Sequence, residues 1–206
     1  EIIPYIAYVL FRIPLPLTIM QILAVDLGTD MFPALALGAE MPSKAVMQQP
    51  PRSPDERLLN FHILGRAYLF LGPIEAFAGL FGFFYVLHSG QWQWGEALAP
   101  GSPLYLQATS ACLAGIIMTQ VGNVFACRSF RESIFSLGFL SNRLLLIGIA
   151  IELIISAFIF YSPFGNEVVG TSPLSYTIWT VLLPFSIALL GAEELRKCYV
   201  RRFSKA

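Results

Sequence analysis

Five long apolar stretches divide the sequence, with polar loops between them. They cover residues 18–38, 61–87, 104–127, 143–162 and 174–194. A helix needs about 20 mostly apolar residues to cross a bilayer, so each stretch predicts one spanning helix. A sixth apolar segment, 1–11, would extend only about 16 Å, roughly half of a ~30 Å hydrocarbon core. We therefore expect an all-α, polytopic transmembrane bundle of five full spans plus a truncated N-terminal half helix.

Composition supports a membrane protein and argues against two other classes. Apolar residues make up 56% of the 206 residues and charged residues only 13%, about half of the ~25% usual in soluble domains. Because the net charge is zero, no overall field would attract nucleic acid. Cys112, Cys127 and Cys198 lack any ligand spacing and are expected to pack as small apolar side chains. The start at Glu1, inside an apolar run, predicts a fragment of something longer.

Basic residues lie almost entirely on one side of the predicted membrane. Of the 13 Lys and Arg residues, only Arg12 falls in a loop on the other side. Cytoplasmic loops of membrane proteins carry the excess of Lys and Arg, so loops 39–60 and 128–143 and the C-terminus are expected to be cytoplasmic. Trp92, Trp94 and Tyr105 fall near the opposite boundary, where aromatic belts form. We expect an integral, multi-pass protein whose first partner is the lipid bilayer.

The informative residues are polar side chains within or at the edge of the apolar stretches. They are Glu1, Asp26, Asp30, Glu75 and Glu152, with the amides Gln21, Gln120 and Asn123. An ionisable group at the centre of a spanning helix costs about 2.5–3.5 kcal/mol, so four of them cost roughly as much as a whole domain's stability. No Lys or Arg lies at matching depth. A stability role alone does not explain this cost, and we expect these groups to handle cations.

The sequence DLGTD at residues 26–30 narrows the chemistry. Asp26 and Asp30 are four residues apart and share one face of a continuous helix. Gly28 weakens that helix by about 1 kcal/mol, and Pro33 cannot donate a hydrogen bond to the carbonyl of Thr29. We expect a broken or unwound helix whose carboxylates, hydroxyl and carbonyls form an all-oxygen site for a hard cation. The alternative is a proline-kinked helix with protonated aspartates bonded to neighbours.

The other polar residues in the spans leave alternatives open. Glu75, which follows Gly72-Pro73, is either a proton or cation relay or a protonated acid bonded to a neighbouring helix. Glu152 is a candidate ligand or proton-path group. Gln120 and Asn123 share one helix face, where amides commonly join helices at ~0.6 kcal/mol per bond; packing is favoured for Gln120, which is also a candidate relay.

Four motifs resemble type II P-type cation pumps. IPLPL at residues 13–17 and VDLGTDMFPA at 25–34 resemble the fifth-to-sixth helix region of these pumps. QPPRSP at 49–54 resembles the loop after their sixth helix, and EELRK at 193–197 resembles the end of their tenth. The resemblance covers essentially the whole chain and implies the C-terminal transmembrane domain, from the outer half of helix five to helix ten. The DLGTD form is more similar to the sodium/potassium branch than to the reticulum calcium pumps.

The resemblance also implies a set of cation ligands. Glu1 falls on the family's helix-five carboxylate, and Asp26, Thr29 and Asp30 fall on its helix-six ligand positions. Gln120 and Asn123 on helix eight and Glu152 on helix nine fall where sodium pumps build an additional sodium site. Two departures stand out: sodium pumps carry Asp at the position of Asn123, and the family carries an amide at the position of Glu75.

What the family implies for activity extends beyond these residues. The phosphorylated-aspartate motif DKTGT, the TGES loop and the nucleotide domain of such pumps are absent from the 206 residues. The fragment alone is therefore expected to have no catalytic residues for ATP hydrolysis, with ATP and magnesium confined to the missing cytoplasmic domains. The transported cation would be sodium, potassium or calcium. Expected partners are the missing helices one to four, those domains and a small regulatory subunit.

Two other classes of protein would also place acids in a bilayer. Half of a secondary cation or proton transporter would carry carboxylates on a broken midplane helix, but it predicts an inverted repeat, and DLGTD occurs once. A non-transporting membrane scaffold or accessory subunit would tolerate neutral replacements of both aspartates.

Overall fold

The computed structural model describes residues 2–42 and 59–203, and within these ranges every regular element is helical. The elements are α1 (Ile2–Phe11), α2 (Ile19–Leu23), η1 (Ala24–Thr29), α3 (Met31–Gly38), α4 (Phe61–Gly65), η3 (Arg66–Leu71), α5 (Gly72–Ser89), α6 (Pro103–Cys127), α7 (Ile134–Leu137), α8 (Arg143–Tyr161), α9 (Pro163–Val169) and α10 (Tyr176–Phe203).

The expected membrane bundle is confirmed. Five helical stretches are long and apolar enough to cross a bilayer: Ile19–Gly38, Phe61–Ser89, Pro103–Cys127, Arg143–Tyr161 and Tyr176–Phe203. The short helix α1 precedes them. The last helix continues beyond residue 194, the end we expected from hydropathy, because its final turns are polar and basic but still helical. Glu1 and much of the 39–60 loop, with Lys44, Arg52 and Arg57, lie outside the described residues, as does Lys205.

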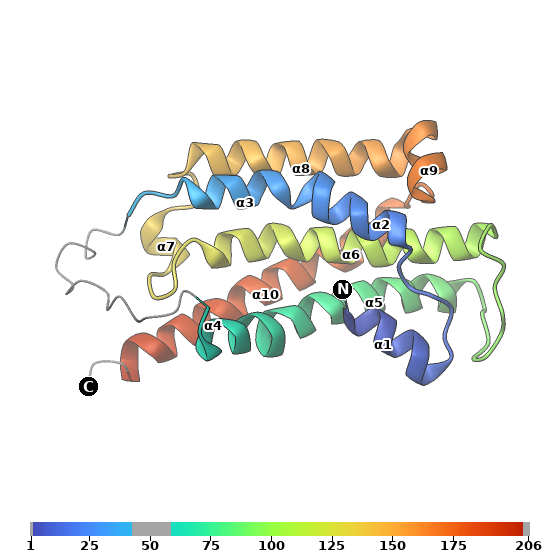
Figure 1. Ribbon diagram of the computed structural model, residues 1–206, viewed down its shortest axis with the longest axis horizontal. Coiled ribbons are helices and arrows are strands. Elements are labelled where there is room, and N and C mark those ends of the chain that lie inside the picture. Colours follow the sequence, from blue (N-terminus) through green and yellow to red (C-terminus); the bar gives the residue numbers. More distant parts are fainter. Residues whose placement is uncertain (1, 43–58, 204–206) are drawn as a thin grey trace.

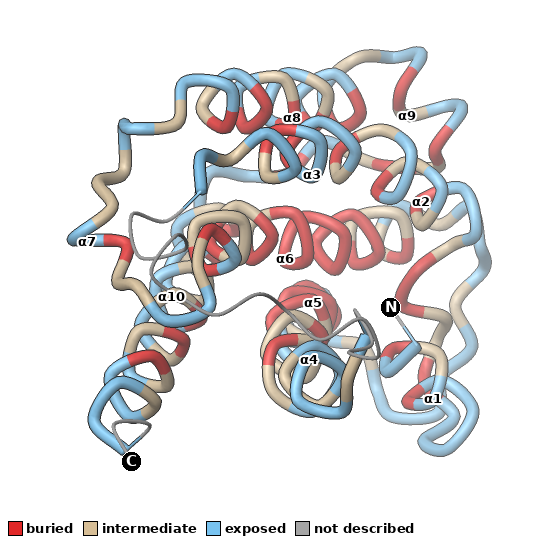
Figure 2. The backbone as a smooth tube through the Cα atoms, turned by 60° about the vertical axis from the view of Figure 1, so that its left-hand side comes forward, coloured by how far each residue is buried: buried red, intermediate tan, exposed pale blue. Residues whose placement is uncertain are grey.

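Helix α6 is the centre of the bundle. It packs against α5 and α10 on one side and against α3, η1 and α8 on the other, as Figures 1 and 2 show. In its most apolar stretch 67% of the residues are buried, against 22% to 39% in the other four spans. The other spans turn many large apolar side chains outward, as expected of surfaces that face lipid.

Small residues allow α5 and α6 to approach closely. A Cβ at Gly82 would lie 2.5 Å from the carbonyl oxygen of Ala111, and one at Gly115 would lie 2.6 Å from that of Ala78. Backbones can come this close only where one of the two residues at the contact has no Cβ. These small residues therefore form a helix–helix contact, which brings polar groups on α5 within reach of α6.

Two prolines explain two wide helical turns. Pro33 and Pro73 have no N–H, and in an α-helix each ring would clash with the carbonyl four residues earlier. Before each proline the helix widens into a π-helical segment, η1 and η3, with bonds from Asp30 N to Val25 O and from Gly72 N to Ala67 O. The expected break at residues 26–30 is thus a π-helical turn rather than an unwound segment, because widening relieves the clash while keeping the helix continuous.

Polar residues begin most of the helices. Thr18 and Gln21 form a capping box. At five further helix starts a side chain accepts from a backbone N–H of the first turn: Asn60, Ser102, Ser133, Asn142 and Ser162. Each such cap is worth about 1 kcal/mol. Gln21 also donates to Thr109 and to the carbonyl of Gly170, so this intramembrane amide has a structural role.

Ion pairs hold one end of the bundle together, where α3, α6 and α10 end and α8 begins (Figure 1). Glu40 accepts two hydrogen bonds from Arg128, at 3.0 and 2.7 Å, and a third from Asn142 at 2.7 Å. Arg128 also donates to Gly138 O and to Ser141. The end of α3 is therefore tied to the segment between α6 and α8.

Replacing Gly115 by alanine is expected to push α5 and α6 apart and to destabilise the bundle by about 1–3 kcal/mol, the usual cost of overpacking. The measurement is the thermal midpoint of the purified protein in detergent. Gly191→Ala is the matched control, since a Cβ there meets nothing within 4 Å, and alanine favours helix. Equal midpoints for the two variants would show that the contact is looser than described.

Glu40 should make stability depend on pH. The hydrogen bond from Arg128 is the main cause that lowers the pKa of Glu40 below its ordinary value. Partial burial raises this pKa, and the hydrogen bond from Asn142 lowers it again. A lowered native pKa gives stability that is present above the unfolded value of about 4.3 and lost as the pH falls through the native one. We expect wild type to be more stable than Glu40→Gln at neutral pH, with the difference shrinking as the pH falls below the unfolded value of about 4.3. A difference that persists in acid would contradict this assignment.

Candidate functional site

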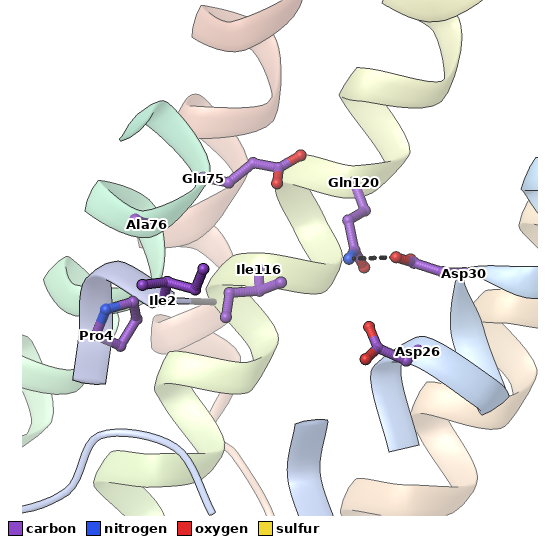
Figure 3. A pocket seen from close by; sticks show the side chains of 8 residues that line it. All are labelled: Ile2, Pro4, Asp26, Asp30, Glu75, Ala76, Ile116 and Gln120. Carbon is purple, nitrogen blue, oxygen red and sulfur yellow. Dashed lines mark hydrogen bonds between the residues drawn. The ribbon is translucent and has the colours of Figure 1, made fainter. Parts of the chain in front are cut away.

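A cavity of about 330 Å³ lies between α1, η1, α5 and α6. Figure 3 shows the side chains that line it. They are Ile2, Pro4, Asp26, Asp30, Glu75, Ala76, Ile116 and Gln120. Three carboxylates, from two separate parts of the sequence, therefore share one cavity inside the span region.

The wide turn η1 forms one wall. Asp26 lies within η1 and Asp30 follows it directly, so both carboxylates reach the same cavity even though the turn is π-helical. Thr29 is fully buried, and its hydroxyl donates to the carbonyl of Val25 at 3.1 Å. Its own carbonyl is the one that Pro33 cannot bond. The wall thus combines two acids with a backbone that has lost one internal donor.

Helix α5 forms the facing wall and α6 lies between the two. Glu75 reaches the cavity from the turn after η3, on the side opposite Asp26 and Asp30 (Figure 3). The Gln120 amide donates to Asp30 Oδ2 at 3.0 Å, and the Asn123 amide donates to Glu75 Oε1 at 3.0 Å. Two amides on one face of α6 therefore hold one acid from each wall.

Gln120 points to a ligand of this cavity. Its side chain is 9% exposed, and its carbonyl oxygen Oε1 has no hydrogen-bond partner among the described residues. Its N–H group is already bonded to Asp30. A buried acceptor without a donor costs about 1–3 kcal/mol, which a cation or a water in the cavity would offset.

Glu152 lies on α8, which packs against η1 and α3. It is fully buried, and neither of its carboxyl oxygens has a hydrogen-bond partner within the described part of the chain. The carboxyl group of Asp30 lies close enough to Glu152 for the two to interact electrostatically. Glu152 is therefore next to the Asp30 wall, behind the cavity rather than among the residues that line it.

The structure brings together only part of the set predicted from sequence. Asp26, Asp30, Glu75 and Gln120 line one cavity. Asn123 contacts it through Glu75, Thr29 and Glu152 are buried beside it, and Glu1 lies outside the described residues. Within those residues, no three His, Cys, Asp or Glu side chains are near enough to hold a metal ion together. The acids face one another across a space wider than a coordination shell.

Sequence reasoning missed a buried charged cluster at the end of the bundle. Glu193 is fully buried and pairs with Arg66 at 2.8 Å and with Arg196 at 2.7 Å, so it joins η3 to α10. Lys197, also fully buried, pairs with Glu194 at 3.0 Å. The spacing of three residues in Glu193–Arg196 and Glu194–Lys197 predicts these pairs on a helix, but the apolar pattern of the span hides their burial.

Comparison with known proteins identifies the family. The family described as cation transporting ATPase, C-terminus, matches residues 14–199. The sodium/potassium-transporting ATPase subunit alpha-4 of Rattus norvegicus is 31% identical over 229 residues, which cover 98% of this chain and 22% of the relative. The alpha subunit of Drosophila melanogaster is 31% identical over 227 residues and alpha-2 of Gallus gallus 29% over 228, with the same coverage.

These matches confirm the resemblance that the DLGTD and proline motifs indicated. The chain spans about a fifth of the length of the curated relatives it matches. A match along nearly all of its own length, together with five membrane-spanning helices, leads to one conclusion: this chain belongs to the cation-transporting ATPase family, in the C-terminal membrane region of that family.

Proposed function

We propose that the chain is the membrane part of an ATP-driven cation pump and supplies the carboxylates that bind the transported cation. The observation that carries this proposal is the cavity in which Asp26 and Asp30 face Glu75 across α6. Acids inside a membrane span are expensive and typically mark ion pathways. Carboxylate, amide and carbonyl oxygens suit hard cations such as sodium, potassium or calcium.

The width of the cavity suits a site that changes during a transport cycle. The acids do not form a closed coordination shell in this conformation, and Asp26 is exposed at the cavity's edge. In the pump, cation binding would draw the two walls together and cover this edge. The π-helical turn is suited to such a shift, since a helix with one weakened bond bends more easily than a regular one. Glu1, Thr29, Asn123 and Glu152 are further candidate ligands around this centre.

The rest of the cycle belongs to parts of the pump beyond this chain. We propose that helices one to four and the cytoplasmic domains, which bind ATP and magnesium and form the aspartyl phosphate, complete the enzyme. A small regulatory subunit is a further candidate partner. The basic residues around the ion-paired end would make that end cytoplasmic, with loops 39–60 and 128–143 and the C-terminus on the same side.

Asp26→Asn should abolish the cation response of the full-length pump. The amide keeps the size of the side chain but removes the charge that attracts the cation. No response is therefore expected up to at least about ten times the concentration that is half-maximal for wild type. Asp30→Asn should behave similarly and also weaken the bond from Gln120. The measurement is phosphoenzyme formation from ATP in detergent, across sodium, potassium, calcium and magnesium at several pH values.

Glu167→Gln, an exposed acid on α9, is the matched control and should retain the wild-type response. If wild type responds to one cation and the aspartate variants do not, the transported ion is identified. If no phosphoenzyme forms under any condition, the pump proposal fails, and a secondary transporter or a membrane scaffold takes its place.

Glu152→Gln separates a ligand from a structural acid. Since the carboxyl group has no hydrogen bond to lose among the described residues, the variant should keep or raise the thermal midpoint measured without added cation. It should nevertheless raise the cation concentration for half-maximal phosphoenzyme response about tenfold. A lower midpoint with an unchanged cation response would mark Glu152 as a structural residue instead.

A further inference from the structure

Glu75 and Asn123 form a pair between two helices that pack unusually closely. The contact at Gly82 and Gly115 brings α5 against α6, and the η3 turn before Pro73 sets the rotation of α5 at Glu75. As a result the Asn123 amide donates to Glu75 Oε1 at 3.0 Å.

The two members of the pair have different surroundings. Glu75 lines the cavity opposite Asp26 and Asp30. Asn123 is bonded at both ends of its amide, since its Nδ2 donates to Glu75 and its Oδ1 accepts from the thiol of Cys127 at 3.3 Å. These two bonds fix which end of the amide faces Glu75. Asn123 is therefore placed to orient the acid rather than to coordinate a cation itself.

The polar groups around the cavity favour an acid that serves it. Across the cavity, Gln120 offers a buried oxygen with no partner in the described residues. An oxygen without a donor and acids on two walls are what a bound cation requires.

We propose that Glu75 binds the cation directly, as the third carboxylate of the cavity, and that Asn123 is the positioning residue that aims it. The inference rests on the proposed pump function and deepens it. One acid within η1, one directly after it and one on α5 would hold the cation from both sides of α6. The third charge therefore increases the affinity and sets the selectivity between cations. Asn123 would then act as a positioning residue rather than as a ligand.

An exchange of acid and amide between the helices tests this assignment. In the full-length pump, Glu75→Gln should raise the half-maximal concentration of the stimulating cation at least tenfold. Asn123→Asp alone places two acids side by side and should alter selectivity. The double variant, Glu75→Gln with Asn123→Asp, keeps one acid and one amide in the pair but moves the acid to the position that does not line the cavity. Its half-maximal concentration should therefore stay raised at least tenfold. Sodium, potassium, rubidium and calcium chlorides are the probes, and phosphoenzyme level is the readout.

Two further variants distinguish a change in cation binding from a loss of folding. Asn123→Ala removes the donor without adding charge and should change the ratio of half-maximal concentrations between cations more than it changes the thermal midpoint. Glu167→Gln again serves as the unaffected control. The inference is overturned if Glu75→Gln keeps the wild-type cation response, or if the double variant recovers that response. When wild type responds and Asp26→Asn does not, either result removes only the role of Glu75 and leaves the pump function standing.

Discussion

The close contact of α5 and α6 is the interaction on which the site depends. Gly82 and Gly115 let the two backbones approach to a distance that any side chain would prevent. Only at that separation does Asn123 reach Glu75, and only then does α6 stand between two walls that both carry acids. In a bilayer, where apolar side chains gain nothing by leaving lipid, such packing and hydrogen bonds are what holds helices together.

A second constraint shapes the helices themselves. Each backbone group within the bilayer has to be satisfied inside the protein, yet Pro33 and Pro73 remove donors from two spans. Both helices respond in the same way, by widening into a π-helical turn. Such turns are frequent at functional sites, and here both lie beside the acids of the cavity. Each proline therefore also places a nearby carboxylate: Pro33 that of Asp30, which precedes it, and Pro73 that of Glu75, which follows it.

The sequence was sufficient for the architecture but only partly for the site. Apolar length alone predicts five spans, and the spacing of Asp26 and Asp30 predicts one shared wall. The form of the turn between them was not predictable, because a proline clash can be relieved by unwinding, kinking or widening. Nor were the bonds of Gln120 to Asp30 and Asn123 to Glu75, since they depend on the rotation of three helices about their axes. Burial of Lys197 and Glu193 was hidden for the same reason.

The central claim is that acids from the η1 wall and from α5 bind one cation together. The location of the bound cation tests this claim most directly. Crystals of the full-length pump grown with rubidium, thallium(I) or calcium would reveal the bound ion by its anomalous scattering. The account predicts a peak inside the cavity between Asp26, Asp30 and Glu75, close to the Gln120 carbonyl oxygen. A bound ion found elsewhere in the membrane region, with this cavity empty, would contradict it.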